Sequence, residues 1–150
     1  MGQQQLLLLV LATVIVGLAT VAGIQAFDEG QTQATQDALT QRAIEIGNNI
    51  AAADAKPTQM GGITVGGGSY NAEDAAKAAG YDSTTPSADG AGDGAGCEIS
   101  STGEVVECSS DGGSDVTNGT DNQYVKVEVD PSSENPVTVT NINGREIGSV

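Results

Sequence analysis

Two cysteines are the most reactive side chains in this chain of 150 residues, which contains no histidine. Cys97 and Cys108 lie eleven positions apart, and the chain has no Cys-x-x-Cys pair. Zinc binding and thioredoxin-like redox chemistry need ligands or spacings that this sequence lacks. An even number of cysteines in a short, outward-facing chain predicts a disulfide instead. Closing so short a loop contributes on the order of 3 kcal/mol to stability, less any strain.

Carboxylates are the second group that could do chemistry, because 20 Asp and Glu face only 5 Lys and Arg, for a net charge of −15. Such a surface repels nucleic acid and anionic lipid headgroups, so neither is expected as a partner. Some aspartates lie in glycine-rich loops, where carboxylate and carbonyl oxygens can wrap Ca²⁺: Asp89, Asp93, Asp111, Asp115 and Asp121. Their spacing does not match the EF-hand loop. Two interpretations stay open: weak Ca²⁺ candidates, chiefly the last three, or a hydrated surface adapted to high salt. No other cofactor is expected.

Other site chemistry has little support in the sequence. We expect a protein that is not an enzyme, because there is no histidine base, nucleophile elbow, phosphate-binding loop or pair of carboxylates on a rigid element. Asn118 begins an Asn-Gly-Thr glycosylation pattern, which is common by chance.

The residues above lie in an acidic, β-rich head at residues 57–150, whose start is marked by a proline and a glycine-rich run. A short strand is expected at 63–65. A helix is expected at 72–79, capped by Asn71 and closed by Gly80.

Several segments of the head carry strand signals. The stretch between the cysteines folds back on a turn at 101–104, which brings Cys97 opposite Cys108. Residues 124–130 alternate, with their valines on one face: Val125, Val127 and Val129. Asn143-Gly144 between two further strands is the strongest short hairpin signal. An antiparallel sheet of three to five strands follows.

The N-terminal stretch is the most apolar element, because residues 6–27 are 22 consecutive positions without a charge. As a helix rising ~1.5 Å per residue it spans about 33 Å, enough to cross a hydrocarbon core of ~30 Å. A secretory signal peptide has a basic n-region and a shorter apolar stretch, so cleavage after Ala26 is not expected. A resident membrane anchor usually has flanking Lys or Arg and an aromatic belt of Trp and Tyr, and both are missing here. The third alternative is a helix that packs against copies of itself.

The helix is expected to continue through residues 28–56, since no proline occurs before Pro57. Apolar residues recur there at spacings of four and three, which places them on one face: Leu39, Ala43, Ile46, Ile50 and Ala53. Because the head has few apolar residues of its own, we expect its valine face to pack on this stripe. The predicted fold class is α+β: a long N-terminal helix, apolar in 1–27 and amphipathic in 28–56, against a small antiparallel sheet with one disulfide.

A short polar cap, an unbroken apolar helix, an amphipathic extension and a β-rich head together resemble a type IV pilin or pseudopilin. The resemblance covers residues 1–55, and the rest of the chain by architecture alone. It implies that a prepilin peptidase removes a leader, that Met1 is the mature N-terminus with a methylated amine, and that apolar half-helices bundle in a filament core. The core residues would be Leu6, Leu7, Leu8, Leu9, Leu11, Val14, Ile15, Leu18, Val21, Ile24 and Phe27.

Two sequence features bear on this resemblance. The family usually has a Glu at the fifth mature position, whose carboxylate neutralises the N-terminal amine of a neighbouring subunit, whereas this chain has Gln5 preceded by Gln3 and Gln4. An amide accepts a hydrogen bond without supplying a countercharge, so we hypothesise that the three glutamines share that task as a polar cluster. Gly17 and Gly23 either allow close helix contact or mark a stretch that loses its helical hydrogen bonds in the filament, as in the bacterial pili that this resembles.

The function that the resemblance implies is that of a structural subunit, polymerised as a helical homopolymer in an extracellular pilus-like filament and used in adhesion or surface motility. Before assembly the chain would lie in the inner or cytoplasmic membrane, with the prepilin peptidase and the pilus assembly machinery as partners. Two alternatives stay open: a pseudopilin of a secretion machine, and a membrane-tethered extracytoplasmic module that binds calcium or a glycan.

Overall fold

The computed structural model describes residues 2–68, 70–112 and 123–147. By internal contacts the chain forms two compact units, residues 1–33 and residues 34–150. The first unit consists of the N-terminal part of helix α1 (Gly2–Asp54). The second unit contains the rest of α1 together with the whole head, so the amphipathic part of the helix belongs structurally to the head from residue 34 onward.

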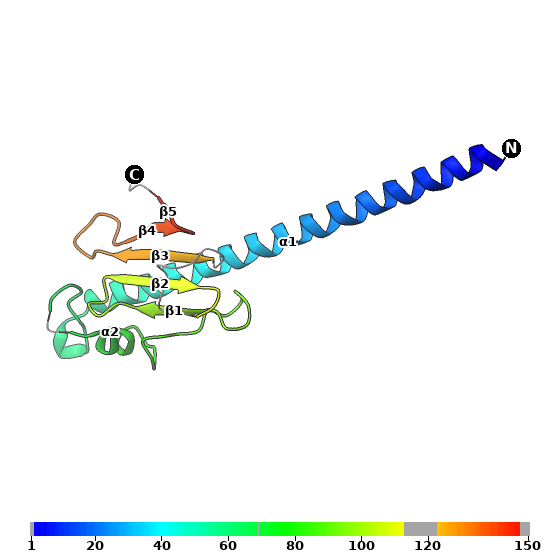
Figure 1. Cartoon of the computed structure of the whole chain (residues 1–150). Helices are drawn as coiled ribbons and strands as arrows, with labels where there is room; N and C mark the ends of the chain where they lie inside the picture. Colours follow the sequence, from blue (N-terminus) through cyan, green and yellow to red (C-terminus); the bar gives the residue numbers. More distant parts are fainter. Residues whose placement is uncertain (1, 69, 113–122, 148–150) are drawn as a thin grey trace. The chain divides into compact units, whose positions relative to one another are not determined.

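The head is built on a five-stranded antiparallel sheet in which every strand pairs with its neighbour in the sequence. The strands are β1 (Gly96–Ile99), β2 (Val105–Ser109), β3 (Tyr124–Val129), β4 (Val137–Ile142) and β5 (Arg145–Glu146). Figure 1 shows them side by side, with the second part of α1 against one face of the sheet. The α+β fold class is therefore confirmed.

The apolar stripe of α1 supplies the centre of the core. Its five members are completely buried: Leu39, Ala43, Ile46, Ile50 and Ala53. The valines of β3 are buried opposite them, as the alternation predicts. Each fully buried Leu or Ile contributes about 1.5–3 kcal/mol, so this stripe carries much of the stability of a head that is otherwise poor in large apolar side chains.

Gly47 sets how closely the helix approaches the sheet. A Cβ at this position would lie 2.9 Å from Cγ1 of Val137 and 3.3 Å from Cγ1 of Val127, closer than van der Waals contact permits. The absence of a side chain on this face therefore lets β3 and β4 press against the helix backbone. The sequence pattern did not indicate this role, because the glycine stands between Ile46 and Ile50 without a motif of its own.

The disulfide between Cys97 and Cys108 is present, and the two residues are directly opposed in the β1–β2 ladder. Both side chains are buried on the face of the sheet that bears the valines. The expected hairpin between them is confirmed. Gly103 adopts the turn conformation, with a φ of 73°, and its N–H donates to the carbonyl of Ser100.

Helix α2 (Ala72–Ala78) begins as expected. The Asn71 side chain accepts from the N–H of Asp74, and the Asp74 carboxylate accepts from the N–H of Asn71, which together form a capping box. The helix ends at Ala78, with Ala79 as its C-terminal cap and Gly80 at a φ of 91°.

The expected strand at residues 63–65 is absent. The N–H of Ile63 donates to the carbonyl of Ala53 at 3.3 Å, and the N–H of Val65 donates to Oδ1 of Asp54 at 2.8 Å. The first bond satisfies a carbonyl group of the last turn of α1, where the final carbonyl groups lack partners within the helix, and the second binds a side chain of the same turn. Neither donor is therefore left to pair with a strand. The apolar side chain of Ile63 is still buried, which explains the strand-like pattern.

The hairpin at Asn143-Gly144 is confirmed. Both residues have positive φ, 50° and 77°, the combination that a two-residue turn between twisted strands requires. The last strand is short, since β5 covers Arg145 and Glu146, followed by one further hydrogen bond from the N–H of Ile147 to the carbonyl of Thr140.

Candidate functional site

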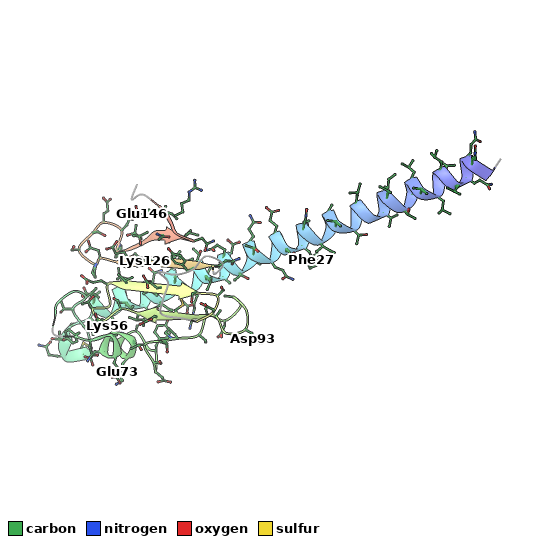
Figure 2. All side chains as sticks on the ribbon, viewed as in Figure 1. Phe27, Lys56, Glu73, Asp93, Lys126 and Glu146 are labelled. Atoms are coloured by element: carbon green, nitrogen blue, oxygen red, sulfur yellow. A yellow bond between two sulfur atoms is a disulfide. The ribbon has the colours of Figure 1, made fainter. Side chains whose placement is uncertain are left out.

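The largest uncovered apolar surface lies on the N-terminal part of α1. Every large apolar side chain from Leu6 to Phe27 is between 50% and 73% exposed in the single chain. Figure 2 shows these side chains projecting on all sides of the helix up to the labelled Phe27. In the described part of the chain this is the one helix long and apolar enough to cross a membrane, and its most apolar 18-residue window has no buried residue. All the residues expected in a filament core therefore lie on one uncharged, uncovered helix.

The two hydroxyl groups inside this segment are satisfied by the helix itself. The hydroxyl of Thr13 donates to the carbonyl of Val10 at 2.9 Å, and that of Thr20 donates to the carbonyl of Val16 at 2.8 Å. Each threonine therefore shows its methyl group to the surroundings. The segment can enter an apolar environment, lipid or protein, without leaving a hydroxyl unpaired.

Gly17 and Gly23 lie within continuous helix, and a Cβ at either position would meet no atom within 4 Å. In the single chain each glycine exposes helix backbone instead of covering a neighbour. Both proposed roles, close helix contact and local melting, concern an assembled state and stay predictions.

The polar cap at the start of the helix consists of Gln3, Gln4 and Gln5, which are all exposed in the first turns of α1. Their amide groups are free to meet another molecule. Met1 lies outside the described residues. Its role as a mature N-terminus stays a prediction, as does the hypothesis that the three glutamines together accept the N-terminal amine of a neighbouring subunit.

The calcium candidates are not brought together as a site by the described residues. In residues 2–68, 70–112 and 123–147, no group of three or more Asp, Glu, Cys or His side chains is placed to hold a metal ion. Asp89 accepts a hydrogen bond from the hydroxyl of Ser87, and Asp93 is exposed in its loop. Asp111 lies in the turn after β2, while Asp115, Asp121 and the glycosylation candidate Asn118 lie outside the described residues.

The outer face of the sheet carries a row of polar side chains that sequence reasoning missed. One residue from each strand is in register across the sheet: Glu98, Glu107, Lys126, Asn141 and Glu146. Lys126 Nζ lies 3.5 Å from Glu107 Oε1, which offsets the repulsion between two directly opposed glutamates. Alternation along the strands indicates which residues point outward, but the row depends on strand register, which the sequence does not reveal.

The few cations of the chain fall into two groups. Three are paired with carboxylates: Arg42 with Glu45, Lys77 with Glu73, and Lys126 with Glu107. The pair on α2 holds the pKa of Glu73 below its usual value, chiefly through its hydrogen bond from Lys77 and then through the charge of that lysine. The other two, Lys56 and Arg145, have no carboxylate partner among the described residues.

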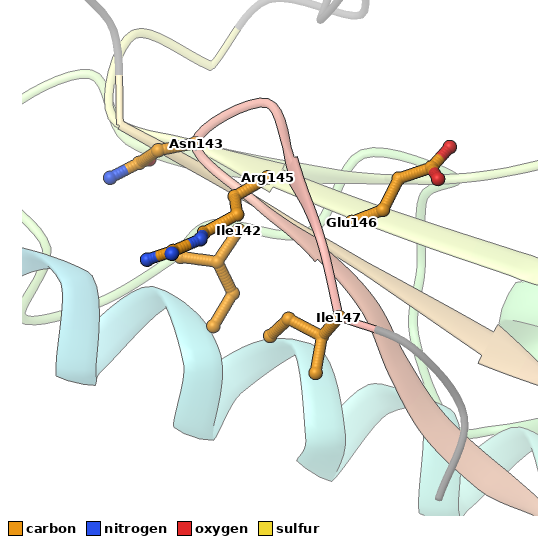
Figure 3. A pocket seen from close by; sticks show the side chains of 5 residues that line it. All are labelled: Ile142, Asn143, Arg145, Glu146 and Ile147. Atoms are coloured by element: carbon orange, nitrogen blue, oxygen red, sulfur yellow. The ribbon is translucent and has the colours of Figure 1, made fainter.

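A pocket on the head surrounds the second of these two cations, Arg145. A pocket of about 630 Å³ at the β4–β5 hairpin is lined by Ile142, Asn143, Arg145, Glu146 and Ile147. Figure 3 shows Ile142, Arg145 and Ile147 on the same side of the hairpin, with Glu146 turned away from them. A positive charge here stands next to an apolar wall.

Two features of the described surface stand out, the uncovered apolar segment of α1 and the pocket at the β4–β5 hairpin. No protein-family model, no curated protein and no solved structure matches the chain, so these surfaces are the guide to its role.

Proposed function

We propose that the chain is a structural subunit of an extracellular filament resembling type IV pili, and that it polymerises through residues 6–27. The observation that carries this proposal is the exposure of every large apolar side chain from Leu6 to Phe27, on a helix whose second part buries its apolar stripe against the sheet. Water does not tolerate so large an apolar surface, so a membrane or other protein chains must cover it.

A helix that resides in lipid and a helix enclosed by copies of itself differ in the residues expected at their ends. A helix that resides in a bilayer is usually fixed by Lys or Arg and by Trp or Tyr at the interfaces. The first charges after the apolar segment are Asp28 and Glu29, the first cation is Arg42, and the chain has no Trp. These flanks fit a helix that stays in the membrane before assembly and then moves into a bundle of copies.

Close packing, and not hydrophobicity, has to favour the bundle. Moving leucines from lipid into a protein core gains little, because both environments are apolar. Gly17 and Gly23 leave open space on the helix surface, into which a neighbouring helix can pack. An external assembly machinery supplies the work of extraction in this scheme. Adhesion or surface motility is the use that we propose for the filament.

The same geometry also suits a pseudopilin, which has the same fold in a shorter assembly. A membrane-tethered module is the alternative from another class, and the one observation that favours it is a helix long enough to span a bilayer.

Filament recovery separates these alternatives. Cells are sheared, the supernatant is centrifuged, and the chain is quantified in the pellet and in the membrane fraction. A filament subunit is recovered as polymer from the sheared supernatant. A chain that stays wholly with the membranes and is monomeric in detergent contradicts the proposal.

A paired substitution tests the packing step separately from membrane insertion. Gly17→Leu keeps the segment apolar but fills the space beside the helix, so we expect the chain to insert normally and to lose filament. Leu18→Ile changes shape without changing volume and is the control, with filament retained. If Gly17→Leu gives as much filament as the control, close contact at this position is not part of assembly.

A further inference from the structure

Arg145 has no carboxylate partner among the described residues, although the chain is strongly acidic. The chain has 20 Asp and Glu, and three of its five Lys and Arg already form ion pairs in the described structure. Arg145 is exposed on β5, at the edge of the sheet, with no carboxylate within ion-pair distance among the described residues. A free guanidinium beside so many carboxylates is well suited to recognise an acidic group on another molecule.

The immediate surroundings of Arg145 narrow the chemistry of that group. Ile142 and Arg145 are paired across the hairpin, and Ile142 is also paired with Val125, which points into the core. Arg145, Ile142 and Ile147 therefore share one side of the hairpin, as Figure 3 shows. Ile147 is 41% exposed, and within the described head Met60 is the one other large apolar residue that is exposed. The matching surface must bring apolar side chains directly beside a carboxylate.

Outside the hairpin itself, the large apolar residue that is exposed directly beside a carboxylate on the described surface lies at the end of the apolar segment of α1. Phe27 is 73% exposed and is followed immediately by Asp28. Phe27 and Asp28 follow Ile24 by three and four residues, so both lie beside Ile24 on one face of the helix. Met60 does not provide the combination, because its sequence neighbours are uncharged.

Every copy of the chain carries both surfaces, so two copies can pair with one another. Neither Arg145 nor Asp28 has an ion-pair partner among the described residues. The charges are opposite, and Ile147 on one surface and Ile24 and Phe27 on the other are exposed, while Ile142 is partly buried. Contact therefore covers apolar residues on both surfaces at once.

We propose that the β4–β5 hairpin of one copy docks on the Ile24–Asp28 face of α1 in the next copy, with Arg145 pairing with Asp28. This interaction rests on the proposed filament, for which it supplies a contact between head and helix. Ile142 and Ile147 cover Ile24 and Phe27, while the ion pair sets the register of the two copies. Glu29 follows Asp28 in the sequence but lies on another side of the helix, so it does not take part.

A charge-reversal set tests the pairing. Arg145→Glu and Asp28→Arg each place like charges together, and we expect each to lower the filament recovered after shearing by roughly tenfold, whereas the double variant restores it. Lys56→Glu and Glu29→Arg are the controls, because they make the same charge changes at the other free cation and at the neighbouring acid. The inference is overturned if the two test variants match their controls, or if the double variant is no better than the single ones.

Engineered cysteines provide a second measurement that does not depend on yield. Both native cysteines are joined to each other, so added thiols can be read without interference. A chain with Phe27→Cys and Ile147→Cys should give a ladder of covalent multimers when filaments are oxidised. The control carries Phe27→Cys and Met60→Cys and should give no ladder. A compact cross-linked monomer, or equal ladders in both variants, contradicts docking between copies.

The two proposals fail in different ways. If the unmodified chain gives no filament, the proposed function and this contact fall together. If filaments form and shear normally while the substitutions and cross-links behave as their controls, the contact alone is wrong.

Discussion

The two parts of helix α1 have the same backbone and opposite surroundings. From Leu39 to Ala53 one stripe of apolar side chains is completely buried under the sheet. From Leu6 to Phe27 the apolar side chains point in all directions, and every large one is at least half exposed. A stripe can be covered by one sheet, whereas a helix that is apolar all round must be enclosed on every side. The second part therefore finds its partner within the chain, and the first part has to find it elsewhere.

This difference shows how an acidic head with few large apolar residues can be stable. The helix contributes the buried Leu39, Ile46 and Ile50 to the core, and the head adds two isoleucines, Ile63 and Ile99, and four valines on β2 and β3. The position of the head along the helix is thereby tied to the stripe. In the proposed filament, assembly and folding would then depend on different residues of one helix.

Removal of residues 1–27 should have the largest effect on the behaviour of the chain. We expect a chain that begins at residue 28 to be a folded monomer without detergent, because residues 34–150 form a compact unit by themselves. The complete chain should need detergent or assemble. Size-exclusion chromatography with light scattering measures both states, and denaturant unfolding checks that the head keeps its stability. A truncated chain that is unfolded would show that the head depends on the apolar segment.

A matched pair of isoleucines tests the two parts of the helix directly. Ile46→Ala empties a completely buried site, so we expect the free energy of unfolding of the head to fall by about 2–5 kcal/mol. Ile15→Ala changes a site that is 57% exposed and should alter that free energy by less than about 0.5 kcal/mol. Both are measured by urea denaturation in the same detergent. Equal losses would mean that the apolar part also supports the head.

Loss of the disulfide should destabilise the part of the sheet, β1 and β2, that helps to cover the buried stripe of α1. Replacing Cys97 and Cys108 with Ala removes a short closed loop and should cost about 3 kcal/mol. Because β1 and β2 help to cover the buried stripe, hydrogen exchange of amides at residues 39–53 should become faster. Amides at residues 6–27 should exchange as before. A change confined to β1 and β2 would show that the stripe is held by β3 and β4 alone.

The smallest expected effect concerns the exposed turn at Asp130, which belongs to neither part of helix α1. The hydroxyl of Ser132, and after it the N–H of Ser132, donate to the carboxylate of Asp130 and hold its pKa below the usual value. Such a group contributes stability above its ordinary pKa, and this contribution is lost as the pH falls through the lowered value. Ser132→Ala should therefore raise the pKa of Asp130 toward the ordinary range.

Carboxyl NMR titration measures this change, with Ser133→Ala as the control. The hydroxyl of Ser133 donates to the carbonyl oxygens of Asp130 and Asn135, not to the carboxylate. A pKa of Asp130 that moves equally in both variants would mean that the turn, and not the Ser132 hydroxyl, sets it.

Local patterns predicted the parts of this fold that depend on local chemistry. The spacing of Leu39 to Ala53, the cysteine pair and Asn143-Gly144 each carry their structural reason within a short stretch, and all three are confirmed. The strand at 63–65 was wrong because its backbone donors are claimed by the end of α1, a contact between segments. Strand register also depends on contacts between segments that are distant in the sequence. For that reason we could not predict the polar row on the sheet, nor that Ile142 and Arg145 share one side of the hairpin.

The strand order also has a consequence for how the chain matures. Because each strand pairs with its sequence neighbour, the hairpins can form one after another as the polypeptide is synthesised. The helix comes first, and its stripe stays uncovered until β3 has been made. A ribosome-bound chain at that stage exposes apolar side chains from Leu6 to Ala53, so it is prone to aggregate unless another molecule covers them.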